Sequence, residues 1–217
     1  MLDGLSANAG GWESTSSNWL YGSVRGVEAN KGSDAGDSNY DITLIQNFSD
    51  TNWPGYSSFY LNKKWIAVYE AVSRCNSVIR VVKQAEEDGS ITASQAGLFM
   101  KQARTLRGWY HFEAWRMWQK IPYVDENTPL NNATNKEDVS QKIIDDLAEG
   151  TSLPDDMGAV GRFNSTVSEV LLAKAIMQMN HDYAGALDLL KSASEGTNPA
   201  GEPVGLAATY GEIFNIE

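Results

Sequence analysis

Apolar residues recur every three to four positions between about residues 63 and 87, which is the pattern of a helix with one buried face. Gly89 follows the last apolar position and predicts the end of this helix, because glycine readily adopts the left-handed backbone conformation. We expect the apolar stripe to lie against the core of the protein. It consists of Trp65, Val68, Tyr69, Val72, Cys75, Ile79 and Val82.

A second helical pattern begins at Thr92 and continues to about Lys120, just before an Ile-Pro pair. Thr92 and Gln95 have the spacing of a capping box, in which two side chains accept the backbone N–H groups at a helix start. One face carries Phe99, Ala103, Leu106, Tyr110, Ala114 and Met117. Beside that face lie Trp109, Phe112 and Trp115. We expect the tryptophans of this helix to pack in the core: Trp109, Trp115 and Trp118. This helix is therefore predicted to be surrounded by other helices.

Three shorter helices are predicted at about residues 136–149, 166–180 and 183–194. The first has a buried face formed by Val139, Ile143 and Leu147. Thr166 and Glu169 fit a capping box at the start of the second. Gly196 predicts the end of the third.

The last two predicted helices form a hairpin, because only His181 and Asp182 separate them. Its second arm contains DYAGALDLLKSA, which is typical of a tetratricopeptide-type repeat. The chain contains no convincing series of strands. We therefore predict a mainly α fold, a tetratricopeptide-like helical solenoid.

Residues 1–61 differ in composition from the helical region at residues 62–217. They contain eight glycines and many Ser, Asn and Asp residues, which is typical of loops. They also contain Trp12, Trp19 and Trp53, whereas disordered tails are poor in aromatic residues. We therefore predict long irregular N-terminal loops packed on the helical core, with one early helix near residues 19–27.

Charge and composition narrow the class of partner. With 217 residues, of which 42% are hydrophobic, the chain can form one domain with a sizeable core. The net charge of −11 argues against nucleic acid and against an anionic membrane surface, because phosphates are bound by clustered lysine and arginine. A neutral partner fits this surface best.

The single cysteine excludes an internal disulfide and any metal site built from several cysteines. Cys75 falls in an apolar stripe and is expected to be a small buried residue. No run approaches the ~20 apolar residues of a membrane span. The first residues also lack the basic and apolar regions of a signal peptide, so we expect either a cytoplasmic protein or a mature or trimmed chain.

Four stretches resemble the SusD/RagB family, the surface glycan-binding lipoproteins of Bacteroidetes-type bacteria. The central one, QARTLRGWYHFEAWRMWQKIPYV at residues 102–124, is similar to the family's Ala-Arg-x-Leu-Arg-Ala helix followed by Val-Pro-Leu-Val. The others are residues 62–79, 135–154 and 161–187. All four agree in order and spacing, although Gly108 stands where alanine is usual, the lipid-bearing cysteine is absent and family members are much longer. The chain therefore resembles the N-terminal part of one larger SusD-like domain.

The resemblance implies a non-enzymatic protein exposed on the cell outer membrane. Such a protein binds an oligosaccharide or polysaccharide during polysaccharide utilisation and nutrient uptake, and delivers it to a SusC-like TonB-dependent transporter. The resemblance also implies structural roles for Arg104 and Arg107, and a buried arginine needs a carboxylate or carbonyl partner. The sequence itself indicates no cofactor and no metal site, and the net charge argues against nucleic acid.

The candidate sugar-binding residues lie in the N-terminal loops. Sugar recognition uses aromatic faces that stack on pyranose rings and polar side chains that bond to hydroxyl groups. Trp53 is the strongest candidate, because a Pro-Gly pair forms a tight loop that presents it beside Tyr56. The alternative is that these rings anchor irregular backbone on the core. The predicted site consists of Trp19, Asp37, Asn39, Tyr40, Trp53 and Tyr56.

Catalysis finds little support in the sequence. His111 and His181 lie on different elements, and no metalloprotease, hydrolase or phosphate-loop motif occurs. Asp34 and Asp37 would be the two carboxylates of a glycosidase, which is the least favoured hypothesis. A tetratricopeptide-like scaffold for protein docking is the main alternative to glycan binding, and a peptide-binding member of the same family also remains open.

Overall fold

The structure is a computed structural model that describes residues 20–26, 28–30, 32 and 57–214. Within these residues the ordered elements are all helical, and β-pairing is limited to isolated bridges. The mainly α fold is therefore confirmed. The elements are η3 (Leu20–Val24), α2 (Ser57–Glu87), α3 (Ala93–Trp118), η4 (Leu130–Asn132), α4 (Ser140–Ala148), η5 (Glu149–Ser152), α5 (Ser165–Met179), α6 (Tyr183–Ser194) and η6 (Tyr210–Phe214).

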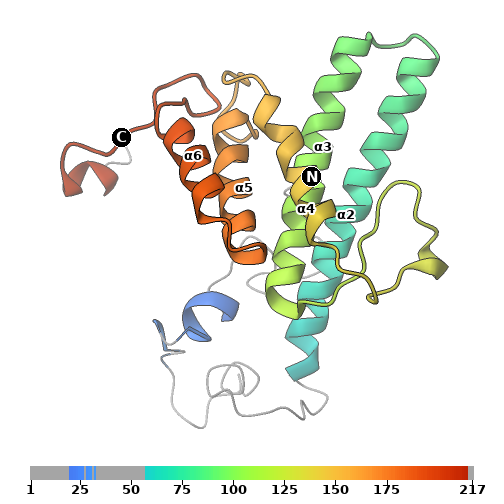
Figure 1. Cartoon of the computed structure of the whole chain (residues 1–217), viewed down its shortest axis with the longest axis horizontal. Coiled ribbons are helices and arrows are strands. Elements are labelled where there is room, and N and C mark those ends of the chain that lie inside the picture. Colours follow the sequence, from blue (N-terminus) through green and yellow to red (C-terminus); the bar gives the residue numbers. More distant parts are fainter. Residues whose placement is uncertain (1–19, 27, 31, 33–56, 215–217) are drawn as a thin grey trace.

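Each helix packs beside the next one in the chain, from α2 through α3, α4 and α5 to α6. Figure 1 shows α2 and α3 as a long antiparallel pair, with the shorter α5–α6 pair on the other side of α4. Because every helix covers the face left open by its predecessor, the apolar stripes form one continuous core. This serial packing is the predicted tetratricopeptide-like solenoid.

The ends of α2 and α3 follow local sequence signals. Gly89 has φ +74° and closes α2 in a Schellman motif, in which Ser90 N–H donates to the Ala85 carbonyl oxygen (2.8 Å). The predicted capping box is also present, since Thr92 and Gln95 bond to each other's backbone N–H groups. These two predictions are confirmed.

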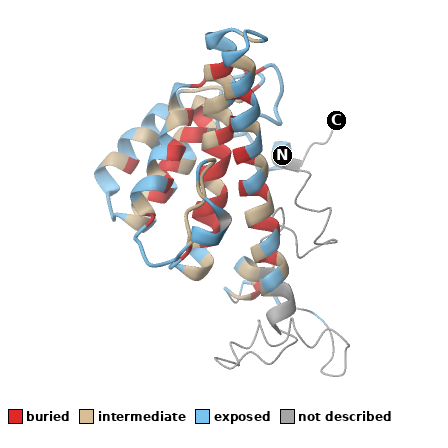
Figure 2. Cartoon of the chain, turned by 90° about the vertical axis from the view of Figure 1, so that its right-hand side faces the viewer, coloured by how far each residue is buried: buried red, intermediate tan, exposed pale blue. Residues whose placement is uncertain are grey.

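The predicted stripe of α2 lies in the core, with its buried positions concentrated on the side that faces the other helices (Figure 2). On α3, however, the prediction is wrong for Phe99, which is 38% exposed. The reason is that the α2–α3 pair extends beyond the other described helices at this end, so none of them covers that face (Figure 1). The fully buried side chains of the predicted α2 and α3 stripes are Val68, Cys75, Ile79, Ala103, Tyr110 and Ala114.

Four boundaries differ from the sequence prediction. The helix expected from about residue 63 begins earlier, at Ser57. The helix expected from residue 136 begins at Ser140, because Asp138 accepts the Ser140 N–H and forms a turn there instead. Asn164, not Thr166, caps α5 by accepting the Val167 N–H (2.9 Å). The helix expected near residues 19–27 is a single π-turn at Leu20–Val24.

Gly108 marks the closest approach of α3 and α4. A Cβ atom there would lie 2.8 Å from the Asp146 Cβ and 3.0 Å from the Leu147 backbone nitrogen. The backbone atoms of α4 cannot move away at low energetic cost. Close packing therefore explains why glycine stands here despite its weak helix propensity.

Replacing Gly108 by alanine is expected to lower the free energy of unfolding by about 1–2 kcal/mol, because overpacking outweighs the gain in helix propensity. Gly97 provides a matched control on the same helix, since a Cβ atom there meets nothing within 4 Å. Gly97→Ala is expected to raise the same free energy by about 0.5–1 kcal/mol. Urea titration followed by circular dichroism measures both, and equal signs would contradict the prediction.

Candidate functional site

A buried polar network joins the segment that follows α3 to helices α2, α3 and α4. Arg107 donates from Nε and Nη2 to the two Asp146 carboxylate oxygens (2.7 and 2.6 Å). Its Nη1 donates to Glu126 (2.7 Å) and to the Asn76 side-chain oxygen (3.0 Å). Tyr123 adds a hydrogen bond to Asp146 (2.7 Å). The expectation that Arg107 has buried carboxylate partners is confirmed, and its role is to connect α2, α3 and α4.

Glu126 is the outer member of this network. Burial opposes its ionisation, but hydrogen bonds from Lys83 and Arg107 outweigh burial and lower the pKa of its carboxyl group to about 2. Arg104, one turn before Arg107, pairs with Glu149 (2.6 Å) in a more exposed position. Both arginines therefore form ion pairs with carboxylates of the helical region.

His111 is a structural histidine. Its Nε2 accepts the Val124 N–H (3.1 Å), so Nδ1 carries the proton and donates to the Arg107 carbonyl oxygen (3.1 Å). Burial, and then the charge of Arg107, lowers the pKa of His111 to about 3. The ring is also stacked on Tyr123, with centroids 4.5 Å apart. A neutral, enclosed imidazole with both nitrogens occupied cannot serve as a general base.

The tryptophans of α3 pack against the core, as predicted. The Trp118 ring meets the Trp65 ring edge-on at 5.0 Å, and Trp109 meets Phe163 at 6.1 Å. Trp115 differs because one side of its ring lines an open hollow. The tryptophans of α3 thus pack against the core, and Trp115 in addition lines a hollow at the surface.

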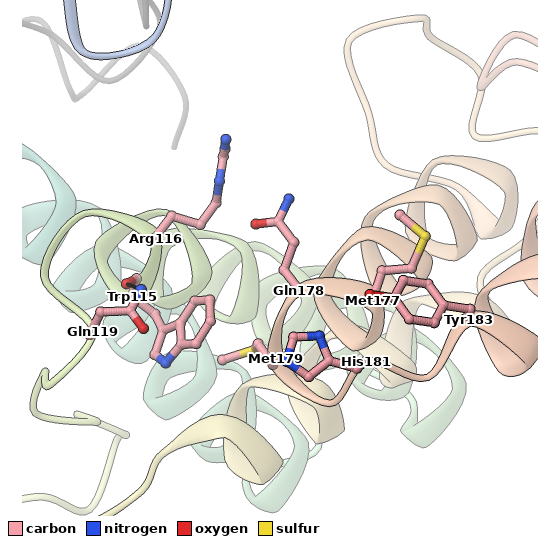
Figure 3. Close-up of a pocket in the computed structure, with 8 residues that line it drawn as sticks. All are labelled: Trp115, Arg116, Gln119, Met177, Gln178, Met179, His181 and Tyr183. Atoms are coloured by element: carbon pink, nitrogen blue, oxygen red, sulfur yellow. Dashed lines mark hydrogen bonds between the residues drawn. The ribbon is translucent and has the colours of Figure 1, made fainter. Parts of the chain in front are cut away.

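This hollow lies where the end of α3 meets the α5–α6 turn, and it has a volume of about 800 Å³ (Figure 3). The end of α3 contributes Trp115, Arg116 and Gln119. The other wall comes from Met177–Met179 of α5, His181 of the turn and Tyr183 of α6.

Two further hollows adjoin the first around the end of α3. One, of about 390 Å³, shares Trp115, Gln119 and Met179 with it and continues to residues 135–140. The other, of about 130 Å³, shares Arg116 and reaches Tyr21 of η3. We call the hollow of about 800 Å³ and the hollow of about 390 Å³ together the α3-end groove.

The backbone is strained at two points of this groove. Gln119 has φ 60° and ψ −66°, and Lys120 N–H donates to the Trp118 carbonyl oxygen (2.6 Å), which makes a γ-turn of the rare positive-φ kind. His181 has φ 56°. Among the described residues these are the two non-glycine positions with positive φ, and both line the same hollow. Such strain concentrates at functional sites.

The first hollow of the groove offers ring faces, thioethers and amides, whereas the second also presents charged side chains of both signs, Lys120, Lys136, Glu137 and Asp138. The charged group of the first hollow, Arg116, is paired with Glu113 (2.8 Å). In the described part of the chain, no group of three or more acidic, histidine or cysteine side chains could hold a metal ion. The lining of the first hollow suits the binding of an uncharged polar molecule.

A family model for SusD-like proteins, described as "Starch-binding associating with outer membrane", matches residues 14–198. The chain belongs to this family. The family resemblance inferred from four sequence stretches is therefore confirmed. A comparison with curated proteins gives no significant match.

Solved structures with the same fold include surface glycan-binding proteins. Surface glycan-binding protein A from Bacteroides thetaiotaomicron, in complex with laminarihexaose, has TM-score 0.64 and 23% identity, covering 84% of this chain and 37% of that one. A laminarin-binding SusD-like protein has TM-score 0.62 and 22% identity, covering 80% and 38%. Surface glycan-binding protein A from Bacteroides uniformis has TM-score 0.57 and 22% identity, covering 70% and 35%. This SusD-like chain thus spans well under half the length of each structure.

The residues predicted from sequence as the sugar site of this SusD-like chain lie outside the described residues: Trp19, Asp37, Asn39, Tyr40, Trp53 and Tyr56. They remain a prediction. Sequence reasoning missed the α3-end groove, because Trp115 was assigned to the core and His181 only to a turn. The available signal was the exposed aromatic Tyr183 directly after a two-residue turn. Within the described residues, no helix combines the length and apolarity needed to span a bilayer.

Proposed function

We propose that this SusD-like protein binds neutral oligosaccharides at the surface of the outer membrane and delivers them, unchanged, to a SusC-like TonB-dependent transporter. The observation that carries this proposal is the family match over residues 14–198, whose description combines starch binding with the outer membrane. Structural neighbours described as binding laminarihexaose and laminarin support a glycan as the ligand.

The physical features of the chain agree with that role. A net charge of −11 disfavours polyanionic ligands and leaves neutral glycans as the simplest class. A frame connected through Arg107 and Asp146 gives a rigid support for binding loops, which is the usual division between scaffold and site. His111 is neutral and enclosed, which supports a binding protein rather than an enzyme.

Isothermal titration of the protein with laminarihexaose, a xylogluco-oligosaccharide and maltohexaose is expected to give binding to at least one of them. Trp53→Ala and Tyr56→Ala are each expected to weaken that binding by about ten-fold, because truncating a stacked ring removes a hot-spot contact. Tyr210→Ala is the matched control, since Tyr210 is 78% exposed and lies outside the α3-end groove.

Three results would count against the proposal. A folded protein that binds none of the glycans removes the glycan claim, and binding of an unstructured peptide instead identifies a peptide-binding member of the family. Release of new reducing ends, lost in Asp34→Asn or Asp37→Asn, identifies a glycosidase.

A protein-docking scaffold is the second candidate, favoured by an exposed apolar row on α6. Tyr183, Leu187 and Leu190 are 65%, 52% and 39% exposed and follow helical spacing. In that case Leu187→Glu abolishes partner capture while Trp53→Ala leaves every binding activity unchanged.

A further inference from the structure

We infer that the α3-end groove is a second contact site for the oligosaccharide, in which sugar rings lie against Tyr183 and against Trp115. The inference rests on the proposed function and deepens it, because it assigns binding to residues of the helical frame in addition to the N-terminal loops. The size of the groove, the chemistry of its walls and its backbone geometry all support this assignment.

The size of the groove suits a chain of sugars. The first hollow, at about 800 Å³, falls within the roughly 300–1,000 Å³ range of small-molecule sites. The second continues from it past Trp115 and Gln119 to residues 135–140. Because the two hollows share a wall, one occupant can lie in both, and a linear oligomer fits that shape better than a compact molecule.

The walls provide both kinds of contact that a sugar needs. Tyr183 is 65% exposed and the Trp115 ring is partly exposed, so aromatic faces are available for the apolar side of a pyranose. Gln119 and Gln178 both line the hollow, and each amide donates and accepts hydrogen bonds as sugar hydroxyl groups do. Figure 3 shows Gln178 of α5 and Arg116 of α3 extending in the same direction from their helices.

The charge of the first hollow favours a neutral ligand over an acidic one. Arg116 is its charged lining group, and Glu113 on the preceding turn of α3 already pairs with it at 2.8 Å. A carboxylated or phosphorylated ligand would have to compete with that ion pair. A neutral oligosaccharide has no such requirement.

The backbone geometry is independent evidence that the site is built. Gln119 and His181 lie on opposite walls of one hollow, and both hold a positive φ that side chains with a Cβ rarely adopt. Unfavourable backbone persists where the surrounding structure holds it in place, and such positions cluster at ligand sites. Here the two turns place one polar side chain on each wall.

The test measures the affinity of the protein for the oligosaccharide from the panel above that it binds most tightly. Tyr183→Ala is expected to weaken binding by about ten-fold, and Gln178→Ala by about three-fold. Tyr183→Phe keeps the ring and is expected to recover most of the affinity lost in Tyr183→Ala. Tyr210→Ala controls for removal of an exposed tyrosine elsewhere.

A second readout locates the sugar. Glycan binding is expected to change the tryptophan fluorescence of the protein, and Trp115→Phe is expected to remove part of that change. Circular dichroism confirms that each variant remains folded.

The outcomes separate this inference from the proposed function. If the wild-type protein binds a glycan but Tyr183→Ala and Gln178→Ala stay within two-fold of it, the groove inference is wrong and the proposed function stands. If the wild-type protein binds no glycan of the panel, both fail. Binding of a peptide that depends on Tyr183 also overturns the inference, since the groove would then serve a different ligand.

Discussion

Replacing Arg107 by methionine is expected to lower the free energy of unfolding by about 3–5 kcal/mol. The substitution removes four hydrogen bonds and leaves Asp146 and Glu126, whose side chains are only 6% and 8% exposed, without their shared cation. A buried carboxylate that loses its partner must remain charged at a high desolvation cost or take up a proton. Urea-induced unfolding at pH 7, followed by circular dichroism, measures the loss.

Arg104→Met is the matched control, one helical turn earlier on the same helix. Arg104 and Glu149 form an equally short ion pair of 2.6 Å, but their side chains are 32% and 34% exposed. Water solvates each partner when the other is removed, so the expected loss is at most about 1 kcal/mol. Equal losses for the two variants would show that burial of the network is not what stabilises the frame.

Lowering the pH from 7 to 5 is expected to reduce stability by about 2 kcal/mol through His111 alone. The pKa of this imidazole falls from 6.5 to about 3 on folding, chiefly because the ring is buried. Below pH 6.5 the unfolded chain therefore binds a proton that the folded protein rejects. The folded state loses stability throughout the window from pH 6.5 down to about pH 3, and the loss is absent above pH 7.

The measurement compares the unfolding free energy at pH 7 and pH 5 in the wild type and in His111→Gln. The glutamine amide can accept the Val124 N–H and donate to the Arg107 carbonyl oxygen but has no titrating group, so the variant is expected to lose this pH dependence. His181→Gln is the matched control, because it leaves His111 and both of its hydrogen bonds in place. In the wild type, an imidazole NMR signal of His111 that titrates near pH 6.5 would falsify the prediction.

Local sequence signals predicted the helices well. Thr92 and Gln95 fixed the start of α3, and Gly89 fixed the end of α2, because capping depends on residues within a few positions of each other. The α5 cap was mispredicted for a tertiary reason. Asn164 is selected because its amide also donates to the carbonyl oxygens of Asp155 and Thr197, the latter 33 residues away.

The candidate groove could not be predicted from the pattern of residues. Its walls join Trp115 and Gln119 of one helix end with His181 and Tyr183, more than sixty positions later in the chain. Apolar periodicity assigns Trp115 to a buried face. It does not show that part of the ring remains exposed to solvent. The positive φ values at Gln119 and His181 are likewise not predicted by the sequence, since glutamine rarely adopts such a value and histidine, although enriched there, adopts it at only a minority of positions.

By itself, the sequence determined the family, the mainly α class and the positions of most helix ends, because these depend on periodicity, caps and a long motif centred on residues 102–124. Only the tertiary structure decided which carboxylates neutralise Arg107, why Gly108 must lack a side chain and where the surface is hollowed. The physical reason is that helix formation is governed by neighbours along the chain. Burial, ion pairing and cavity shape depend instead on how separate helices cross.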